Sequence, residues 1–146
     1  AVKQPLKVNQ LQLSAAFTPS FEAGFHVNME GPKAAVRDGS VFEYCRLTDT
    51  VIQAWSVLQH GYFKGNFVGK EEFAALNHVL TDLAKKYQVT PTAIALAWVL
   101  RYPAKMQAVI GTTNPQHVLE AGKATTVTLT RKEWYQIYLA AGNDLP

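Results

Sequence analysis

The sequence has few of the features that mark secreted, membrane-spanning or disulfide-stabilised proteins. Its 146 residues include one cysteine, Cys45, which excludes an internal disulfide framework and fits a reducing compartment. No apolar run approaches the roughly 20 residues of a membrane helix, and no signal-peptide pattern opens the chain. We therefore expect a cytoplasmic protein with no membrane partner.

Concentrated charge is also missing. The formal net charge is only +3, and the 14 lysine and arginine residues are scattered rather than massed beside aromatic residues. The sequence therefore does not predict nucleic-acid binding. The four histidines lack the spacing of metal ligands, so we expect no metal site; they are His26, His60, His78 and His117.

Apolar residues make up 48% of the chain, enough for one core and one domain over residues 1–146. Their spacing predicts strands at 6–13, 51–55 and 107–110, and helices at 39–47, 71–87, 91–100, 115–124 and 130–141. Strands that alternate with helices form a parallel sheet with crossover helices. Because three strands leave free sheet edges, the chain looks like a piece of a (β/α)8 barrel that needs more strands.

Local signals define several helix ends. Thr90-Pro91 is a cap followed by proline at the first helical position, and Thr130 with Glu133 forms a capping box. The segment 91–100 is apolar almost all round, which predicts heavy burial. The start of the chain is less regular, because it begins at Ala1 rather than Met. Either a leader has been removed, or the chain is part of something longer.

The strand that begins at Val51 ends by presenting an indole and then a hydroxyl, from Trp55 and Ser56. Its apolar residues favour a strand covered on both faces. The carboxyl ends of parallel strands are where α/β proteins bind ligands. Here a flat aromatic side chain is followed by Ser56 and a loop that runs to Gly61. This arrangement suits the binding of a heteroaromatic ring next to a phosphate.

A second candidate site follows the last strand, where Gly111-Thr112-Thr113-Asn114-Pro115 leads into a helix. Free amides at a helix start bind anions, and barrels commonly hold phosphate after their last two strands. His117 and Glu120 lie three residues apart, on one face of that helix. The alternative is a capped strand-to-helix turn with no ligand.

Polar and aromatic residues near the start offer two further candidates. Gln10 is polar within an apolar run, where it would either bind a carboxamide or satisfy a neighbouring backbone group; Asn9 faces the other way and is expected to be structural. The segment 14–38 is long for a connection. Its apolar side chains either wall a substrate pocket or attach the loop to the body; they are Phe17, Phe21, Phe25 and Met29.

Three motifs in this order resemble the aldo-keto reductases, and most closely a bacterial branch of that family. They are Val8-Asn9-Gln10-Leu11-Gln12, Ile52-Gln53-Ala54-Trp55-Ser56-Val57-Leu58 and Val109-Ile110-Gly111-Thr112-Thr113-Asn114-Pro115. The resemblance covers nearly the whole chain. It implies the C-terminal part of a (β/α)8 TIM barrel, with about three strand–helix units and a C-terminal helix. The parent enzyme would transfer hydride from NADPH to a carbonyl.

The resemblance also assigns roles to residues. Gln10 would hold the nicotinamide carboxamide, and Trp55 would stack on the nicotinamide ring. The pyrophosphate would be lined by Ser56, Leu58 and the loop toward Gly61. Gly111, Thr112 and Thr113 would surround the adenosine 2′-phosphate, with Glu120 near the adenine amine.

The sequence departs from the family pattern in ways that affect both cofactor choice and catalysis. Gly111 and His117 stand where many members have a lysine and an arginine for the 2′-phosphate, and Ala121 replaces a common asparagine. Losing both cations weakens the electrostatic case for NADPH over NADH. The family's Asp, Tyr, Lys and His catalytic group lies on earlier strands that this chain lacks, so we expect no catalytic residue here.

Three hypotheses follow. The chain is the C-terminal half of a cytoplasmic carbonyl reductase that needs the other half of its barrel. Alternatively, it is a half-barrel that pairs with a second copy and binds nucleotide without turnover. In the third hypothesis it is a purely structural half-barrel, or a breakdown product, with an apolar flank that drives self-association.

Overall fold

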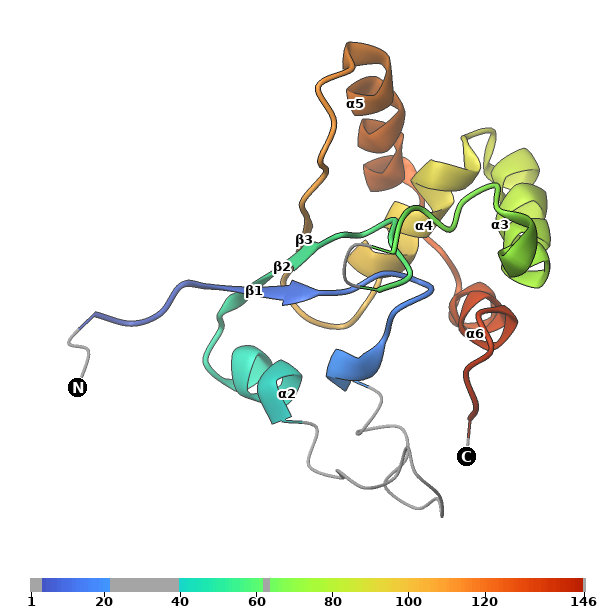
Figure 1. Ribbon diagram of the computed structural model, residues 1–146. Coiled ribbons are helices and arrows are strands. Elements are labelled where there is room, and N and C mark those ends of the chain that lie inside the picture. The colour runs from blue at the N-terminus through green and yellow to red at the C-terminus, as the bar shows by residue number, and fades with distance from the viewer. Residues whose placement is uncertain (1–3, 22–39, 62–63, 146) are drawn as a thin grey trace.

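The computed structural model describes residues 4–21, 40–61 and 64–145 (Figure 1). Three strands form a parallel sheet in the order β1-β2-β3: Val8–Gln12, Val51–Trp55 and Met106–Ala108. In register, Gln10 pairs with Gln53, and Gln53 pairs with Gln107. The predicted parallel sheet is confirmed. The third strand ends two residues earlier than predicted, at Ala108, although the Val109 amide still donates to the Ala54 carbonyl of β2 at 2.8 Å.

The helices follow the sequence pattern closely. They are α2 (Ser40–Leu47), α3 (Ala74–Tyr87), α4 (Pro91–Leu100), α5 (Pro115–Gly122) and α6 (Arg131–Ala140), with short 3-10 helices at Glu71–Phe73 and Lys123–Thr126. The Thr90 hydroxyl accepts the Ala93 amide, and the predicted capping box between Thr130 and Glu133 is complete. These caps explain why α4 and α6 begin where the sequence predicts.

The core lies between the sheet and the group of helices α3, α4 and α6, which stand together beside the sheet in Figure 1. Every residue of α4 from Ala93 to Val99 is buried, as its continuous apolar composition predicts. Trp98 on α4 stacks on Trp134 on α6 with ring centroids 4.7 Å apart. Each indole N–H donates to the backbone carbonyl of the other tryptophan at 3.0 Å, which joins the two helices.

Only one face of the sheet is covered within the described part of the chain. Ile52 and Ala54 are fully buried, whereas Gln53 between them is half-buried. This alternation corrects the expectation of a strand covered on both faces, because the described residues place helices on one side only. We call the side that carries Gln10, Gln53 and Trp55 the open face.

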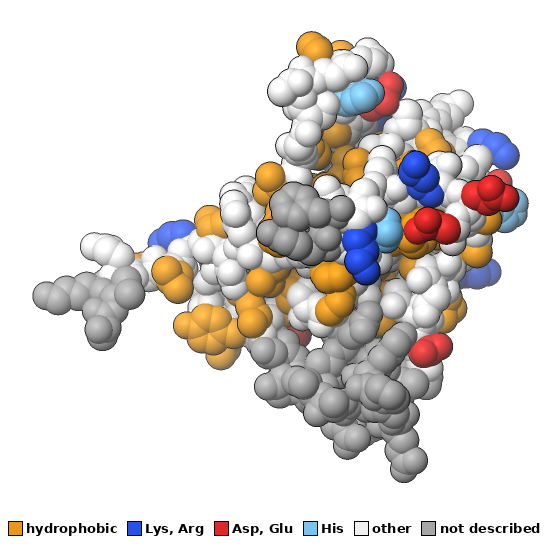
Figure 2. All heavy atoms as spheres, in the orientation of Figure 1, with side chains coloured by type: hydrophobic (Ala, Val, Ile, Leu, Met, Phe, Trp, Pro, Cys, Tyr) orange, Lys and Arg blue, Asp and Glu red, His pale blue; other side chains and the backbone are white. Residues whose placement is uncertain are grey.

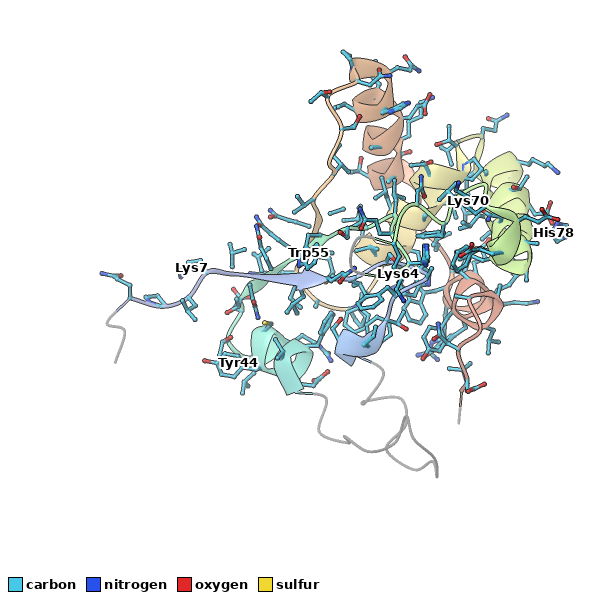
Figure 3. All side chains as sticks on the ribbon, in the orientation of Figure 1. Lys7, Tyr44, Trp55, Lys64, Lys70 and His78 are labelled. Atoms are coloured by element: carbon cyan, nitrogen blue, oxygen red, sulfur yellow. The ribbon has the colours of Figure 1, made fainter. Side chains whose placement is uncertain are left out.

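Apolar side chains gather beside β1 and α2, at the free edge of the sheet. Leu47 is 85% exposed and Tyr44 is 61% exposed, and Leu6 and Val8 are exposed nearby. Figure 2 shows hydrophobic side chains on this flank, and Figure 3 shows Tyr44 pointing outward from α2. No helix among residues 4–21, 40–61 and 64–145 is long and apolar enough to span a bilayer.

Candidate functional site

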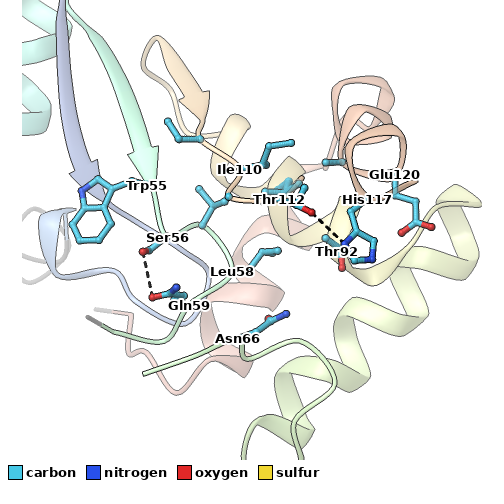
Figure 4. A pocket seen from close by; sticks show the side chains of 15 residues that line it. Trp55, Ser56, Leu58, Gln59, Asn66, Thr92, Ile110, Thr112, His117 and Glu120 are labelled. Carbon is cyan, nitrogen blue, oxygen red and sulfur yellow. Dashed lines mark hydrogen bonds between the residues drawn. The ribbon is translucent and has the colours of Figure 1, made fainter. Parts of the chain in front are cut away.

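A pocket of about 520 Å³ lies at the carboxyl ends of β2 and β3 (Figure 4). Its wall comes from the segment after each strand, from the start of α4 and from the first turns of α5. Seven of the residues predicted to bind a cofactor line it: Trp55, Ser56, Leu58, Gly111, Thr112, His117 and Glu120. Sites predicted from two separate stretches of sequence therefore meet in one pocket.

The turn after β2 aims its side chains into the pocket through an unusual backbone conformation. Ser56 has a φ of +53°, in the left-handed region that residues other than glycine seldom adopt. The Gln59 amide donates to the Ser56 carbonyl at 2.8 Å, and the Ser56 hydroxyl donates to Gln59 Oε1 at 3.3 Å. Such strained positions cluster at ligand sites, where the surrounding contacts must hold them.

Contacts from both sides fix this turn. The Ser14 hydroxyl donates to the Gln59 carbonyl at 2.5 Å, and the Phe67 amide donates to the Leu58 carbonyl at 3.0 Å. Gly61 is not part of the pocket wall; it lies in the loop beyond, where its φ of +149° favours glycine. The wall around Trp55 is thus a braced loop rather than a free one.

The turn after β3 is a capped helix start and a pocket wall at once. Asn114 Oδ1 accepts the Gln116 amide at 2.9 Å, and Pro115 occupies the first helical position of α5. Thr112 Oγ1 accepts the Asn114 amide at 3.2 Å and lies 3.4 Å from His117 Nδ1. A capped strand-to-helix turn and a wall of a ligand pocket are therefore compatible readings of this motif. Thr113 is not among the residues of the wall.

The described residues give the pocket wall no lysine or arginine. The ionisable groups among them are the His117 imidazole and the Glu120 carboxylate. Glu120 Oε1 accepts a hydrogen bond from Gln116 Nε2 at 3.1 Å. Anionic ligands would therefore depend on hydroxyl and amide donors, together with an N–H of the imidazole.

Gln10 lies outside the pocket wall, on the open face of the sheet. Its Nε2 donates to Gln53 Oε1 at 2.8 Å, so it does interact with a neighbouring group, although with a side chain rather than the backbone. Asn9 points the other way and donates to Cys45 Sγ at 3.8 Å, consistent with the structural role expected for it.

Two of the four predicted substrate-lining residues lie among the described residues, and neither lines the pocket. Phe21 is 3% exposed, and its ring centroid lies 5.0 Å from that of Tyr102 and 5.7 Å from that of Phe42. These contacts match the alternative in which the aromatic residue attaches the loop to the body. Phe17 is half-buried beside Ser14. Phe25 and Met29 lie outside the described residues.

Sequence reasoning did not name three polar residues of the pocket wall: Gln59, Asn66 and Thr92. Of these, Gln59 does lie in the loop toward Gly61 that was expected to line the pyrophosphate. Gln59 and Asn66 form a bridge across the loop after β2, so their positions depend on a contact between residues seven apart. Thr92 had a local signal, because it is the second residue of α4, directly after the Thr90-Pro91 cap.

Comparisons with known proteins agree on one family. The model of the aldo/keto reductase family matches residues 28–140. A 6-dehydroglucose reductase from Agrobacterium fabrum is 32% identical over 147 residues, which is 99% of this chain and 42% of that protein. The oxidoreductase YdhF of Escherichia coli is 32% identical over 95 residues, or 64% of this chain and 30% of YdhF.

Solved structures of similar fold point the same way. The thermostable aldo-keto reductase Tm1743 matches with a TM-score of 0.63 and 22% identity, over 94% of this chain and 41% of that one. A Gox0644 variant in complex with NADPH matches with a TM-score of 0.57 and 18% identity, over 92% of this chain and 38% of that one.

The chain belongs to the aldo/keto reductase family. It spans about two fifths of the length of the relatives that it matches along its whole length. Its three-stranded parallel sheet is therefore part of a (β/α)8 barrel, which confirms the predicted fold class and explains why one sheet face and one flank are open.

Proposed function

We propose that this chain carries the cofactor-binding part of an NADP(H)-dependent oxidoreductase that reduces aldehydes or ketones. The observation that carries the proposal is the pocket at the ends of β2 and β3, which gathers Trp55 and Ser56 with Thr112 and His117. The family membership and the NADPH held by the similar Gox0644 structure support it. The reducing compartment indicated by Cys45 fits an enzyme of the cytoplasm.

The residues present fit a nicotinamide dinucleotide. The half-buried indole of Trp55 offers an apolar face for a ring. Ser56 and Thr112 offer hydroxyls, and the volume lies within the range of about 300–1,000 Å³ usual for small-molecule sites. When bound, the dinucleotide supplies the hydride. The chain's own residues hold it, orient its ring against Trp55 and keep solvent from one side of the site.

We propose that the proton for carbonyl reduction comes from outside this pocket. Among residues 4–21, 40–61 and 64–145, the pocket wall contains no tyrosine, lysine or aspartate. The Tyr87 hydroxyl is engaged by Glu133, and Tyr138 is fully buried in the core. We therefore assign the Asp, Tyr, Lys and His group, which the resemblance implies, to the barrel strands that this chain lacks. The missing half of the barrel is the partner that this proposal requires.

NADP(H) is the proposed cofactor, with NAD(H) as the alternative. The 2′-phosphate of NADP(H) would be held by the hydroxyl and amide donors at the start of α5. Within the described part of the chain, His117 is the one basic side chain of the pocket wall that could add to them. Two of the relatives are named 6-dehydroglucose reductase. We therefore include that sugar aldehyde in the panel of carbonyl substrates below.

The experiment uses the complete gene product and measures NADPH affinity by titration calorimetry and NADPH oxidation with the carbonyl panel. We expect Trp55→Leu to weaken NADPH binding about tenfold, because a stacked ring contributes about 0.5–1.5 kcal/mol beyond the area it buries. Trp55→Phe keeps a ring and is the matched control, with a loss of less than about threefold. Equal losses in both variants would contradict the assignment of Trp55 to the nicotinamide.

A second candidate, a half-barrel that pairs with a second copy and binds nucleotide without turnover, has one observation in its favour. Tyr44 and Leu47 expose large apolar surfaces beside the free edge of β1. It predicts a dimeric mass in light scattering and NADPH binding with no oxidation of NADPH by any carbonyl. A monomer that turns over would exclude it.

A further inference from the structure

Asn77 on α3 joins that helix to the loop that precedes it. Its Oδ1 accepts the Gly69 amide at 2.8 Å, and its Nδ2 donates to the carbonyls of Phe67 and Lys70 at 2.9 Å and 3.0 Å. All three partners are backbone groups, whose donor and acceptor roles cannot be exchanged. The orientation of the Asn77 amide is therefore fixed, and we call its three hydrogen bonds the Asn77 brace.

The braced turn is held from its other side by the core. Phe67 is fully buried, and its ring centroid lies 6.2 Å from that of Phe73. The Lys70 amide donates to the Phe67 carbonyl at 3.2 Å, and Gly69 has a φ of +78°, in the left-handed region that favours glycine. A turn fixed at so many points keeps one position relative to α3.

Two contacts carry this position to the pocket wall. The Phe67 amide donates to the Leu58 carbonyl at 3.0 Å, and Asn66 forms an antiparallel bridge with Gln59. Leu58, Gln59 and Asn66 all line the pocket, as Figure 4 shows. Asn77 is not among the residues of the wall, so it can influence a ligand there only through the turn that it braces.

The same turn fixes which atom Asn66 offers to the pocket. The Val68 amide donates to Asn66 Oδ1 at 2.8 Å. Because a backbone amide can only donate, the acceptor end of the Asn66 side chain is the engaged one, and its NH2 end is left for a ligand. A donor at this point suits a phosphate oxygen, because hydrogen bonds to an ionised acceptor are the stronger kind.

Resting on the proposed function, we propose that Asn77 is a positioning residue that holds the Asn66 donor against the bound dinucleotide. Without the Nδ2 bonds of the brace, the Phe67 and Lys70 carbonyls each lose a donor, and the turn shifts away from α3. The bridge to Gln59 shifts with it, so the part of the pocket after β2 changes shape. The start of α5 takes no part in these contacts and keeps its shape.

The test uses the complete gene product and two ligands in titration calorimetry. NADPH spans both parts of the pocket, whereas adenosine 2′-phosphate carries only the groups proposed to bind at the start of α5. Asn77→Asp keeps the size of the side chain and the acceptor for Gly69, and it removes both donors. We expect it to weaken NADPH binding about 3- to 10-fold, the effect of one lost hydrogen bond. Its affinity for adenosine 2′-phosphate should stay within about twofold of the wild type.

A control variant separates this effect from a general loss of stability. Leu83→Ala opens a cavity under the same helix, roughly 9 Å further along its axis, and should leave both affinities within about twofold of the wild type. Asn77→Ala removes the whole brace, and it replaces Asn77→Asp if that variant fails to fold.

Three results would overturn this inference and leave the proposed function standing. They are an unchanged NADPH affinity in a folded Asn77 variant, an equal loss of both ligands in that variant, and the same loss of NADPH in Leu83→Ala. If NADPH does not bind the wild type, the inference and the proposed function both fail.

Discussion

The buried carboxylate of Glu133 allows the sharpest stability prediction. Its side chain, in a residue that is 7% exposed, joins α6 to the end of α3. It accepts hydrogen bonds from Lys86 Nζ at 2.6 Å, from Tyr87 Oη at 2.8 Å, and from the backbone amide and hydroxyl of Thr130, each at 2.8 Å. Glu133→Gln removes the charge on which all four donors converge and keeps the shape of the side chain.

The size of the effect follows from the pKa of Glu133. Burial opposes ionisation and raises this pKa, but the hydrogen bonds from Lys86, Thr130 and Tyr87 outweigh burial and lower it from 4.5 to about 2. At about 1.4 kcal/mol per pKa unit, that difference is roughly 3 kcal/mol of folding free energy at neutral pH. Because Lys86 is largely in solvent, screening weakens its contribution to this free energy. We therefore expect Glu133→Gln to lower the free energy of unfolding by about 2 kcal/mol.

The pH dependence has a definite sign. The folded pKa lies below the unfolded one, so the stabilisation is fully present above about pH 4.5 and is lost as the pH falls through about 2. The measurement is urea unfolding of the complete gene product, followed by tryptophan fluorescence. The difference in free energy of unfolding between wild type and Glu133→Gln at about pH 3 should be less than half of the difference at neutral pH. The exposed Glu71→Gln is the control, expected within about 0.5 kcal/mol of wild type. A difference that is the same at pH 7 and pH 3 would refute the reasoning.

Three other predictions concern the pocket and the core. Asn114→Ala should cost about 1 kcal/mol of stability in urea unfolding through loss of the α5 cap, and Asn114→Ser should restore most of it. His117→Arg should raise the preference for NADPH over NADH about 3- to 10-fold in calorimetry, because it places a fixed positive charge on the pocket wall where the 2′-phosphate would bind. His117→Asn is the neutral control, and an unchanged preference in His117→Arg would exclude this position from the phosphate site. Trp98→Phe should lower the free energy of unfolding by about 2–3 kcal/mol, because it removes the indole hydrogen bond to the Trp134 carbonyl and opens a small cavity. A cost below about 0.5 kcal/mol would contradict this account of how α4 and α6 are joined.

The role of Phe21 could not be predicted from the sequence. An aromatic residue in a long connection is equally consistent with a pocket wall and with a packing contact, since both bury apolar surface. The structure packs Phe21 against the rings of Phe42 and Tyr102, which come from distant segments. Asn66 is the opposite case, a residue of the pocket wall that no local sequence pattern predicts. It reaches the pocket through its bridge to Gln59.

Local sequence patterns are enough to locate the strands and helices of this protein and several of the helix ends. Caps such as Thr90 and Thr130, and the apolar spacing of α3 and α4, act over a few residues, so they are legible without knowing the fold. Which of these elements contact one another is visible only in the folded chain. It brought the ends of β2 and β3 to one pocket and aligned three glutamines across the open face, because strand register and helix packing depend on contacts between residues far apart in the chain.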